Sequence, residues 1–120
     1  MLADCVVLDT NALMMPFQFK LNIDKEIARL LGDVDILVPT SVVEELSRLT
    51  SREAKAALAL SAKYQVVETS MSGDDGVIDV ARRRRAAVVT NDRGLIGRLT
   101  EMGMPVVRLR SGRYLVMTGD

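Results

Sequence analysis

Four acidic residues, spread along the chain, have the type and placement needed to do chemistry at one site. Asp9 and Asp92 each follow an apolar run that is typical of a buried strand. In open α/β sheets, ligands bind outside the carboxyl ends of the strands, so these two carboxylates should face one crevice. Two further acids fall where helices could bring them to the same crevice. The expected cluster consists of Asp9, Glu45, Asp74 and Asp92.

A cluster of carboxylates needs compensation for its charge. Two carboxylates about 5 Å apart repel each other by roughly 3 kcal/mol at an effective dielectric constant of 20. A domain has only about 5–15 kcal/mol of stability in total, so structure alone does not justify such a cluster. Either raised pKa values keep protons on the carboxyl groups, or divalent cations bind them.

The residue inventory narrows the choice of cation. The chain has no histidine and one cysteine, which excludes histidine-based catalysis and argues against zinc. Carboxylate oxygens suit Mg²⁺ or Mn²⁺, and we expect one or two such ions, with Asp9, Asp74 and Asp92 as ligands. An ion held there would lower the pKa of a bound water and favour phosphodiester hydrolysis. Neighbouring polar residues could hold waters or the scissile phosphate: Thr10, Asn11, Asp75, Thr90 and Asn91.

The elements that must position these residues alternate between strand and helix. Apolar runs predict strands at 5–8, 34–38, 64–68, 86–90 and 104–109, and a terminal hairpin that returns through 114–117. Helical spacing predicts helices near 22–31, 42–49, 51–63, 74–81 and 93–102. The segment 14–20 contains a proline and is predicted to be a loop. Expected N-caps are Asn22 or Asp24, Thr40 or Ser41, then Ser51, Ser72 and Asp92.

The helical wheel separates the candidate acids from their neighbours. Glu45 borders the apolar face of its helix, and Glu44 lies nearly opposite. Asp74 projects toward the apolar face of its helix, whereas Asp75 projects away. Each acid also has an ordinary explanation, as a solvated helix former or an N-cap. The joint placement of all four favours a functional site.

Composition limits the remaining choices. The 120 residues, 48% of them hydrophobic, suit one domain spanning 1–120. We expect a cytoplasmic chain without a membrane span, since no stretch reaches the ~20 apolar residues required and the N-terminus has no secretory pattern. The 16 basic and 16 acidic residues cancel, but four clustered acids would leave a net basic surface for an anionic partner.

The arginine run 82–85 has two explanations. Basic residues are favourable at the C-terminal end of a helix, and a phosphate-contacting patch is the alternative. Candidate RNA contacts are Arg82, Arg83, Arg84, Arg85 and Arg93.

The sequence resembles the PIN-domain nuclease family from residue 6 to about 109. Residues 7–13, 39–46, 74–78 and 88–93 are similar to its four motifs. The resemblance implies a three-layer α/β/α fold with a mainly parallel five-stranded sheet, here followed by a C-terminal hairpin. It also implies a Mg²⁺- or Mn²⁺-dependent ribonuclease with an acidic quartet at Asp9, Glu45, Asp74 and Asp92. Two positions depart from the family pattern, Gly76 after the Asp-Asp pair and Gly94 after the fourth motif.

Several biological roles are compatible with this resemblance. The Asp-Asp pair and the hairpin are more similar to the ribosomal-RNA-processing branch than to the toxin branch, so the partner would be a ribosomal processing factor or an antitoxin. The expected substrate is single-stranded or looped RNA. The apolar surface at 56–60 fits a homodimer contact or a core helix equally well.

Two other function classes remain open at this point. One is a catalytically inactive, PIN-like module that binds RNA without cutting it. The other is a phosphoryl-transfer domain in which Asp9 is the nucleophile, as in receiver or haloacid-dehalogenase-like folds. The second acid that the latter needs two residues after Asp9 is missing, since Asn11 stands there.

Overall fold

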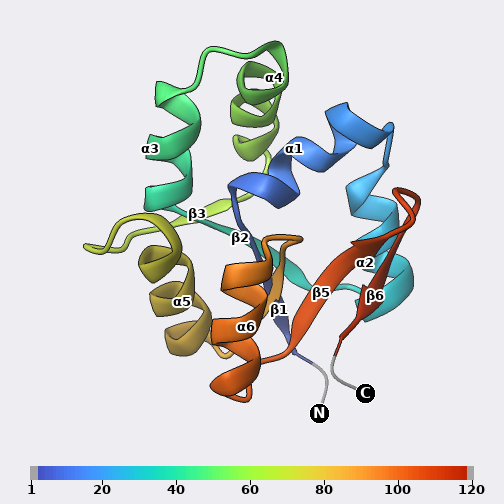
Figure 1. Ribbon diagram of the computed structural model, residues 1–120, viewed down its shortest axis with the longest axis vertical. Coiled ribbons are helices and arrows are strands. Elements are labelled where there is room, and N and C mark those ends of the chain that lie inside the picture. Colours follow the sequence, from blue (N-terminus) through green and yellow to red (C-terminus); the bar gives the residue numbers. More distant parts are fainter. Residues whose placement is uncertain (1–2, 119–120) are drawn as a thin grey trace.

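Six strands form one sheet in the computed structural model, which describes residues 3–118 (Figure 1). The order across the sheet is β3-β2-β1-β4-β5-β6, and every neighbouring pair is parallel except β5 with β6. The strands are β1 (Cys5–Leu8), β2 (Asp35–Pro39), β3 (Gln65–Val67), β4 (Ala87–Val89), β5 (Val106–Arg110) and β6 (Tyr114–Met117). The predicted parallel strands are confirmed, and the hairpin adds the sixth strand.

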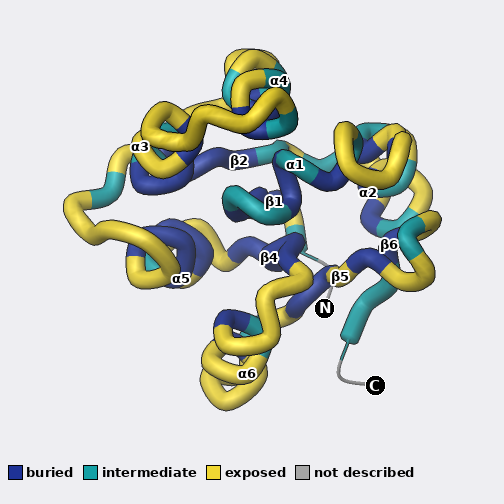
Figure 2. The backbone as a smooth tube through the Cα atoms, turned by 45° about the horizontal axis from the view of Figure 1, so that its top comes forward, coloured by how far each residue is buried: buried dark blue, intermediate teal, exposed yellow. Residues whose placement is uncertain are grey.

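Within residues 3–118, six helices lie on the two faces of this sheet. They are α1 (Thr10–Phe19), α2 (Ile23–Leu31), α3 (Thr40–Arg48), α4 (Arg52–Ser61), α5 (Gly73–Arg84) and α6 (Arg93–Glu101). Figure 2 shows the strands as a largely buried layer, with α1–α4 on one side and α5 and α6 on the other. The predicted three-layer α/β/α architecture is confirmed. None of the helices within residues 3–118 is long and apolar enough to cross a membrane.

The strand order places a crevice between β1 and β4. From β1 the chain continues toward β2 and β3, whereas from β4 it continues in the opposite direction toward β5. The two strands pair in parallel, with Leu8 opposite Val89. Their carboxyl ends therefore meet at a point where the winding direction reverses, which is where α/β folds bind ligands. Both strands are fully buried, in agreement with their continuous apolar sequence.

The predicted loop at 14–20 is wrong, because residues 10–19 form the continuous helix α1. Pro16 lies inside this helix, where a proline removes one backbone hydrogen bond. Burial of Ala12, Leu13 and Met15 in the core outweighs that local cost. The helix ends at Lys20, which adopts a left-handed conformation with φ 54°.

The N-cap predictions were correct at most helices and wrong at one. Asn22, Ser51 and Asp92 each accept a hydrogen bond from the backbone of the first turn, while Ser72 holds the N-cap position without such a bond. At α3 the N-cap is Pro39, and the expected caps Thr40 and Ser41 lie inside the helix. The Thr40 hydroxyl instead accepts from the backbone N–H of Thr69, 3.1 Å away. It therefore ties α3 to the segment that precedes α5.

Candidate active site

A cleft of about 310 Å³ lies at the carboxyl ends of β1 and β4, and all four predicted acids line it. Asp9 directly follows β1, and Asp92 begins α6 after β4. Glu45 comes from the second turn of α3 and Asp74 from the first turn of α5. The structure thus brings together carboxylates that are up to 83 residues apart in the sequence, from position 9 to position 92.

Asp9 is the most buried of these acids, with 5% of its surface exposed. One of its carboxylate oxygens, Oδ1, accepts a hydrogen bond from the backbone N–H of Ala12 at 2.7 Å and so caps α1. Burial raises the pKa of Asp9 to about 7, against the lowering effect of hydrogen bonds from Thr90 and Ala12. The charges of Asp74 and Asp92 raise this pKa further.

The pKa of Asp74 is also raised. Burial raises its pKa, and so does the charge of Asp92, followed by that of Glu45. The Arg98 guanidinium acts in the opposite direction without reversing the shift. Two carboxyl groups of the cleft, Asp9 and Asp74, therefore have raised pKa values to which neighbouring acids contribute, and such perturbed groups in a cleft are typical of functional sites.

Hydrogen bonds hold the other two acids in position. The Asp92 carboxylate accepts from the Leu95 backbone N–H at 3.0 Å and caps α6. The Thr10 hydroxyl donates to Glu45 Oε1 over 2.5 Å, which links the start of α1 to α3. These contacts use backbone and hydroxyl donors, and within residues 3–118 no basic side chain forms an ion pair with a cleft acid. The cluster is thus oriented by the fold but not neutralised by it.

Gly76 allows α3 and α5 to approach closely enough to share the cleft. A Cβ atom at this position would lie 2.7 Å from the Ser41 Cβ and 2.9 Å from the Met71 carbonyl oxygen. Real side chains do not tolerate such distances, so only glycine fits here. The departure from the family pattern at Gly76 therefore has a packing cause, and it sets the spacing of the helices that carry Glu45 and Asp74.

The predicted polar residues divide into two groups. Thr10 and Asn11 line the cleft. Thr90 and Asn91 do not line it. The Thr90 hydroxyl donates to the Asp9 carboxylate and accepts from the Asp92 N–H at 3.0 Å, so it contacts two of the acids, whereas Asn91 Oδ1 accepts from the Leu109 N–H at 2.7 Å. Asn11 supports the same region by accepting from the Asn91 backbone N–H at 3.0 Å.

Asp75 lies outside the cleft and faces a neighbouring hollow of about 860 Å³. It pairs with Arg98 at 2.7 Å, which ties the start of α5 to α6. Of the Asp-Asp pair, the structure therefore places Asp74 with the other acids.

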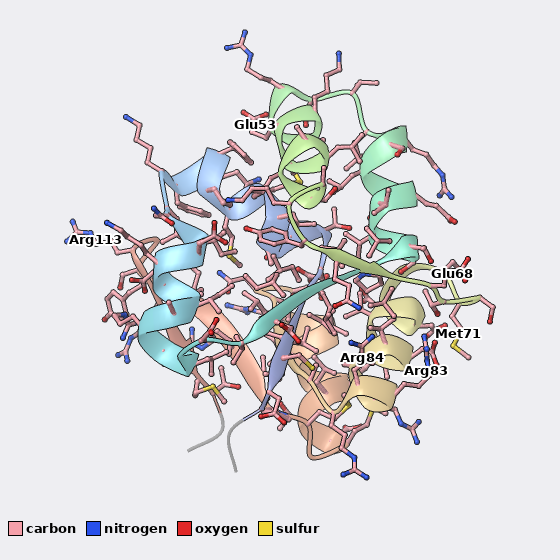
Figure 3. All side chains as sticks on the ribbon, turned by 180° about the vertical axis from the view of Figure 1, so that it is seen from behind. Glu53, Glu68, Met71, Arg83, Arg84 and Arg113 are labelled. Carbon is pink, nitrogen blue, oxygen red and sulfur yellow. The ribbon has the colours of Figure 1, made fainter. Side chains whose placement is uncertain are left out.

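The arginine run at the end of α5 is spread over different surroundings. Arg83 pairs with Asp79 at 3.0 Å and donates to the Glu68 carbonyl at 2.6 Å; Figure 3 shows Arg83 beside the segment that carries Glu68. Arg82 lines the 860 Å³ hollow together with Arg83 and Arg98. Of the five candidate RNA contacts, Arg83 alone has an ion pair among the described residues, and Arg82, Arg84, Arg85 and Arg93 have none. The run is not a single stripe, as four consecutive helical residues cannot share one face.

Sequence reasoning missed four residues of the cleft wall, Gly73 and Val77 of α5 and the pair Met14 and Gln18. Met14 and Gln18 belong to α1, in the segment that was predicted to be a loop. Their spacing of four residues from Thr10 would have placed them on the cleft side if the helix had been recognised.

The donor set of the cleft fits a hard divalent cation. All four acids supply carboxylate oxygens, which Mg²⁺ and Mn²⁺ prefer. In the conformation described for residues 3–118, no three acidic, cysteine or histidine side chains are arranged around a common ion position. Mg²⁺ usually keeps several waters and takes only one or two protein carboxylates, so pairs of these acids suffice.

Comparisons with known proteins agree with this architecture. The family model described as a PIN-like domain matches residues 6–112. Ribonuclease VapC4 of Methanocaldococcus jannaschii is 33% identical over 126 aligned positions, covering 95% of this chain and 96% of the relative. Ribonuclease VapC9 of Archaeoglobus fulgidus is 31% identical over 116 positions, covering 91% and 85%.

A solved structure supports the fold independently. The PIN domain endonuclease Utp24 superimposes with a TM-score of 0.82 at 20% identity, over 94% of this chain and 90% of that one. At this level of identity the likeness concerns the fold alone. The family match spans nearly the whole sheet and every element that supplies a cleft acid, and the chain belongs to the PIN-like domain family.

Proposed function

We propose that this protein is a Mg²⁺- or Mn²⁺-dependent endoribonuclease. The observation that carries the proposal is the convergence of Asp9, Glu45, Asp74 and Asp92 on one cleft, with the pKa of Asp9 raised to about 7. Perturbed carboxyl groups gathered in a cleft are typical of catalytic sites. The ribonuclease names of the two relatives support the same activity.

Each acid has a proposed role that follows from its position. Asp9, Asp74 and Asp92 would hold one or two ions, and Glu45, fixed by Thr10, would orient their waters. A bound divalent ion lowers the pKa of water and stabilises the leaving oxygen of a phosphodiester. Asn11 supplies an amide for a water or a phosphate oxygen.

The substrate we propose is single-stranded or looped RNA, whose phosphates need positive charge close to the cleft. Arg82, Arg85 and Arg93 are exposed and form no ion pair among residues 3–118. Arg82 also lines the hollow on the far side of α5, next to Arg98. We propose that this hollow receives the RNA backbone on its way from the cleft.

The biological role is a finer question. The names of both curated relatives favour the toxin-type role, with an antitoxin as partner, over the ribosomal-RNA processing that the sequence motifs indicated. A homodimer through residues 56–60 stays a prediction; in the structure Ala57 is buried in the core and Leu58 and Leu60 pack against it.

The test is cleavage of a structured RNA by the wild type and by Asp9→Asn, with and without Mn²⁺. Asparagine also caps helices, so this variant keeps α1 in place and removes only the charge. We expect metal-dependent cleavage by the wild type and a loss of about 100-fold or more, equivalent to about 2.7 kcal/mol, in the variant. Equal rates in both proteins would remove the assignment.

A non-catalytic RNA-binding module is the second candidate function. The observation in its favour is that no three acids within residues 3–118 are arranged around one ion position. This function predicts tight RNA binding that does not depend on metal, and no turnover at any Mn²⁺ concentration. The same cleavage assay therefore separates the two candidates.

A further inference from the structure

One wall of the acidic cleft is formed by side chains that phosphodiester hydrolysis does not use. Met14 and Gln18 line the cleft together with the acids. They follow Thr10 at intervals of four residues, so all three lie on one side of α1. Met14 is half-buried and Gln18 is exposed. The acids therefore face a neutral surface that offers one flexible apolar group and one amide.

The phenylalanines of the chain provide a second, independent observation. The chain has two phenylalanines and no tryptophan, and both phenylalanines are exposed on α1, Phe17 to 42% and Phe19 to 47%. Phenylalanine is normally among the residues that a core buries, together with leucine, isoleucine and valine. In this protein the core is built from leucine, valine, isoleucine, alanine and methionine, with Cys5. Exposed aromatic rings beside a cleft indicate a binding surface.

The two rings differ in their surroundings. Phe19 lies against the turn between β5 and β6, because a Cβ on Gly112 would be 3.0 Å from its Cδ1 atom. Phe17 follows Met14 by three residues, a spacing that makes the two side chains neighbours on the helix surface. Phe17 does not itself line the cleft, but of the two rings it is the one next to Met14, which does.

This combination matches an unpaired nucleobase. Bases of single-stranded RNA stack on exposed aromatic rings, and the thioether of methionine packs favourably against ring systems. A glutamine amide carries both a donor and an acceptor, and it pairs with the N6 and N7 atoms of adenine. The neutral wall is thus suited to a base, while the acids and their ions are suited to the phosphate.

We propose that Met14, Phe17 and Gln18 form a nucleobase subsite next to the cleaved bond, with adenine as the expected base. Phe17 and Met14 contact the face of the base, and the Gln18 amide reads its edge. The inference rests on the proposed ribonuclease function and adds to it the group that selects the cleavage site.

Binding can be tested without turnover, in metal-free buffer. Because the chain lacks tryptophan, Phe17→Trp introduces a single fluorescent indole at the proposed stacking position. Titration with oligoadenylate RNA should cause a saturable loss of its emission. Tyr114→Trp is the matched control, since Tyr114 is 40% exposed on β6 and does not line the cleft. Its emission should stay constant over the same titration.

Specificity is tested on a pool of RNA with a randomised segment, by sequencing the ends produced in Mn²⁺. The wild type should favour one base at a fixed position beside the cut. Gln18→Ala should reduce that preference by about 10-fold or more, the usual value of one bidentate base contact. Gln65→Ala, an exposed glutamine on β3, should leave it unchanged.

The outcomes separate the subsite from the proposed function. Unchanged emission of the Phe17→Trp protein, or an unchanged base preference in Gln18→Ala, overturns the subsite even if the wild type cuts RNA. Conversion of a dimer to a monomer by Phe17→Ser with base preference intact also overturns it, because the ring is then a protein contact. Failure of the proposed function has a different result: the wild type itself leaves the pool uncut with Mg²⁺ and with Mn²⁺.

Discussion

The acidic side chains whose pKa values are shifted fall into two groups, one in the cleft and one in ion pairs outside it. In the cleft, the pKa values of Asp9 and Asp74 are raised, first by burial and then by neighbouring acids. Elsewhere, the pKa of Glu26 is lowered by its bond with Arg29, and that of Asp79 by Thr69 and Arg83. The chain pairs its structural acids internally, whereas the cleft acids repel one another.

The paired acids connect elements of the fold. Glu26 binds Arg29 at 3.0 Å and accepts from the Leu115 backbone N–H at 2.8 Å, which joins α2 to β6. Asp24 binds Lys63 at 2.6 Å and Tyr64 at 2.7 Å, which joins α2 to the end of α4. No comparable bond joins two cleft acids. The difference indicates that the first region stabilises the protein and that the second sacrifices stability for function.

The largest expected effect is the pH dependence of stability in the metal-free protein. A folded pKa of about 7 for Asp9 lies above its unfolded value of about 3.9, so the folded state binds the extra proton. The contribution is fully present below about pH 4 and is lost as the pH rises through about 7, at most about 4 kcal/mol. Asp9→Asn should therefore be more stable than the wild type at pH 8 and equal to it at pH 4, by urea unfolding.

The second largest effect is expected from metal binding to the cleft acids. Millimolar Mn²⁺ should raise the melting temperature of the wild type. At a Mn²⁺ concentration of 100 times Kd, the free energy of unfolding should increase by about 2.7 kcal/mol. Asp92→Asn should raise the metal-free melting temperature and abolish the response to Mn²⁺, while keeping the N-cap of α6. A metal-free melting temperature that does not change in this variant would mean that the carboxylates are not close together.

A smaller effect is expected from the contact that spaces the cleft helices. Gly76→Ala would place a methyl group against Ser41 and the Met71 carbonyl, at a cost of about 1–3 kcal/mol for overpacking. Adding Ser41→Gly to Gly76→Ala should restore some stability. The second substitution removes the Ser41 side chain that the new methyl group would meet, and that side chain carries a buried hydroxyl with no hydrogen-bond partner among the described residues. Thermal unfolding of the single and double variants is the measurement. If Gly76→Ala alone were as stable as the wild type, α3 and α5 would not be in close contact at this position.

The smallest effect is expected in the paired region. Burial raises the pKa of Asp24, but the bonds from Lys63 and Tyr64 outweigh it, so the net shift is downward. Its stabilisation is thus present above about pH 4 and is lost as the pH falls further. Because the pair is partly exposed, Asp24→Asn should cost only up to about 1 kcal/mol at neutral pH and should not alter RNA cleavage. A large loss of RNA cleavage in this variant would contradict the view that the paired acids serve stability alone.

The sequence predicted the strands and the meeting of the acids because both depend on short-range pattern. Uninterrupted apolar runs identify β1 and β4 as buried strands, and an acid directly after each run marks the same sheet edge. Parallel winding then places Glu45 and Asp74 nearby. The wheel favoured Asp74 over Asp75 without deciding between them, since one residue along a helix changes the direction of the side chain by about 100°. In the structure it is Asp74 that lines the cleft.

The features that sequence reasoning missed depend on tertiary contacts. Pro16 suggested a loop, but packing of Leu13 and Met15 maintains the helix α1. Because the helix was not predicted, Gln18 was left out of the predicted site. Asn91 and Thr90 have side chains suited to a phosphate, yet both already form hydrogen bonds within the protein. Local sequence does not reveal which polar groups the fold already occupies.

The central claim is that burial, together with the neighbouring carboxylates, raises the affinity of Asp9 for a proton, and a direct titration of the Asp9 carboxyl carbon by NMR tests it. In metal-free buffer the account predicts a pKa of about 7 in the wild type and a lower value in both Asp74→Asn and Asp92→Asn. A pKa near the ordinary value of about 3.9, or one that neither substitution lowers, would contradict it.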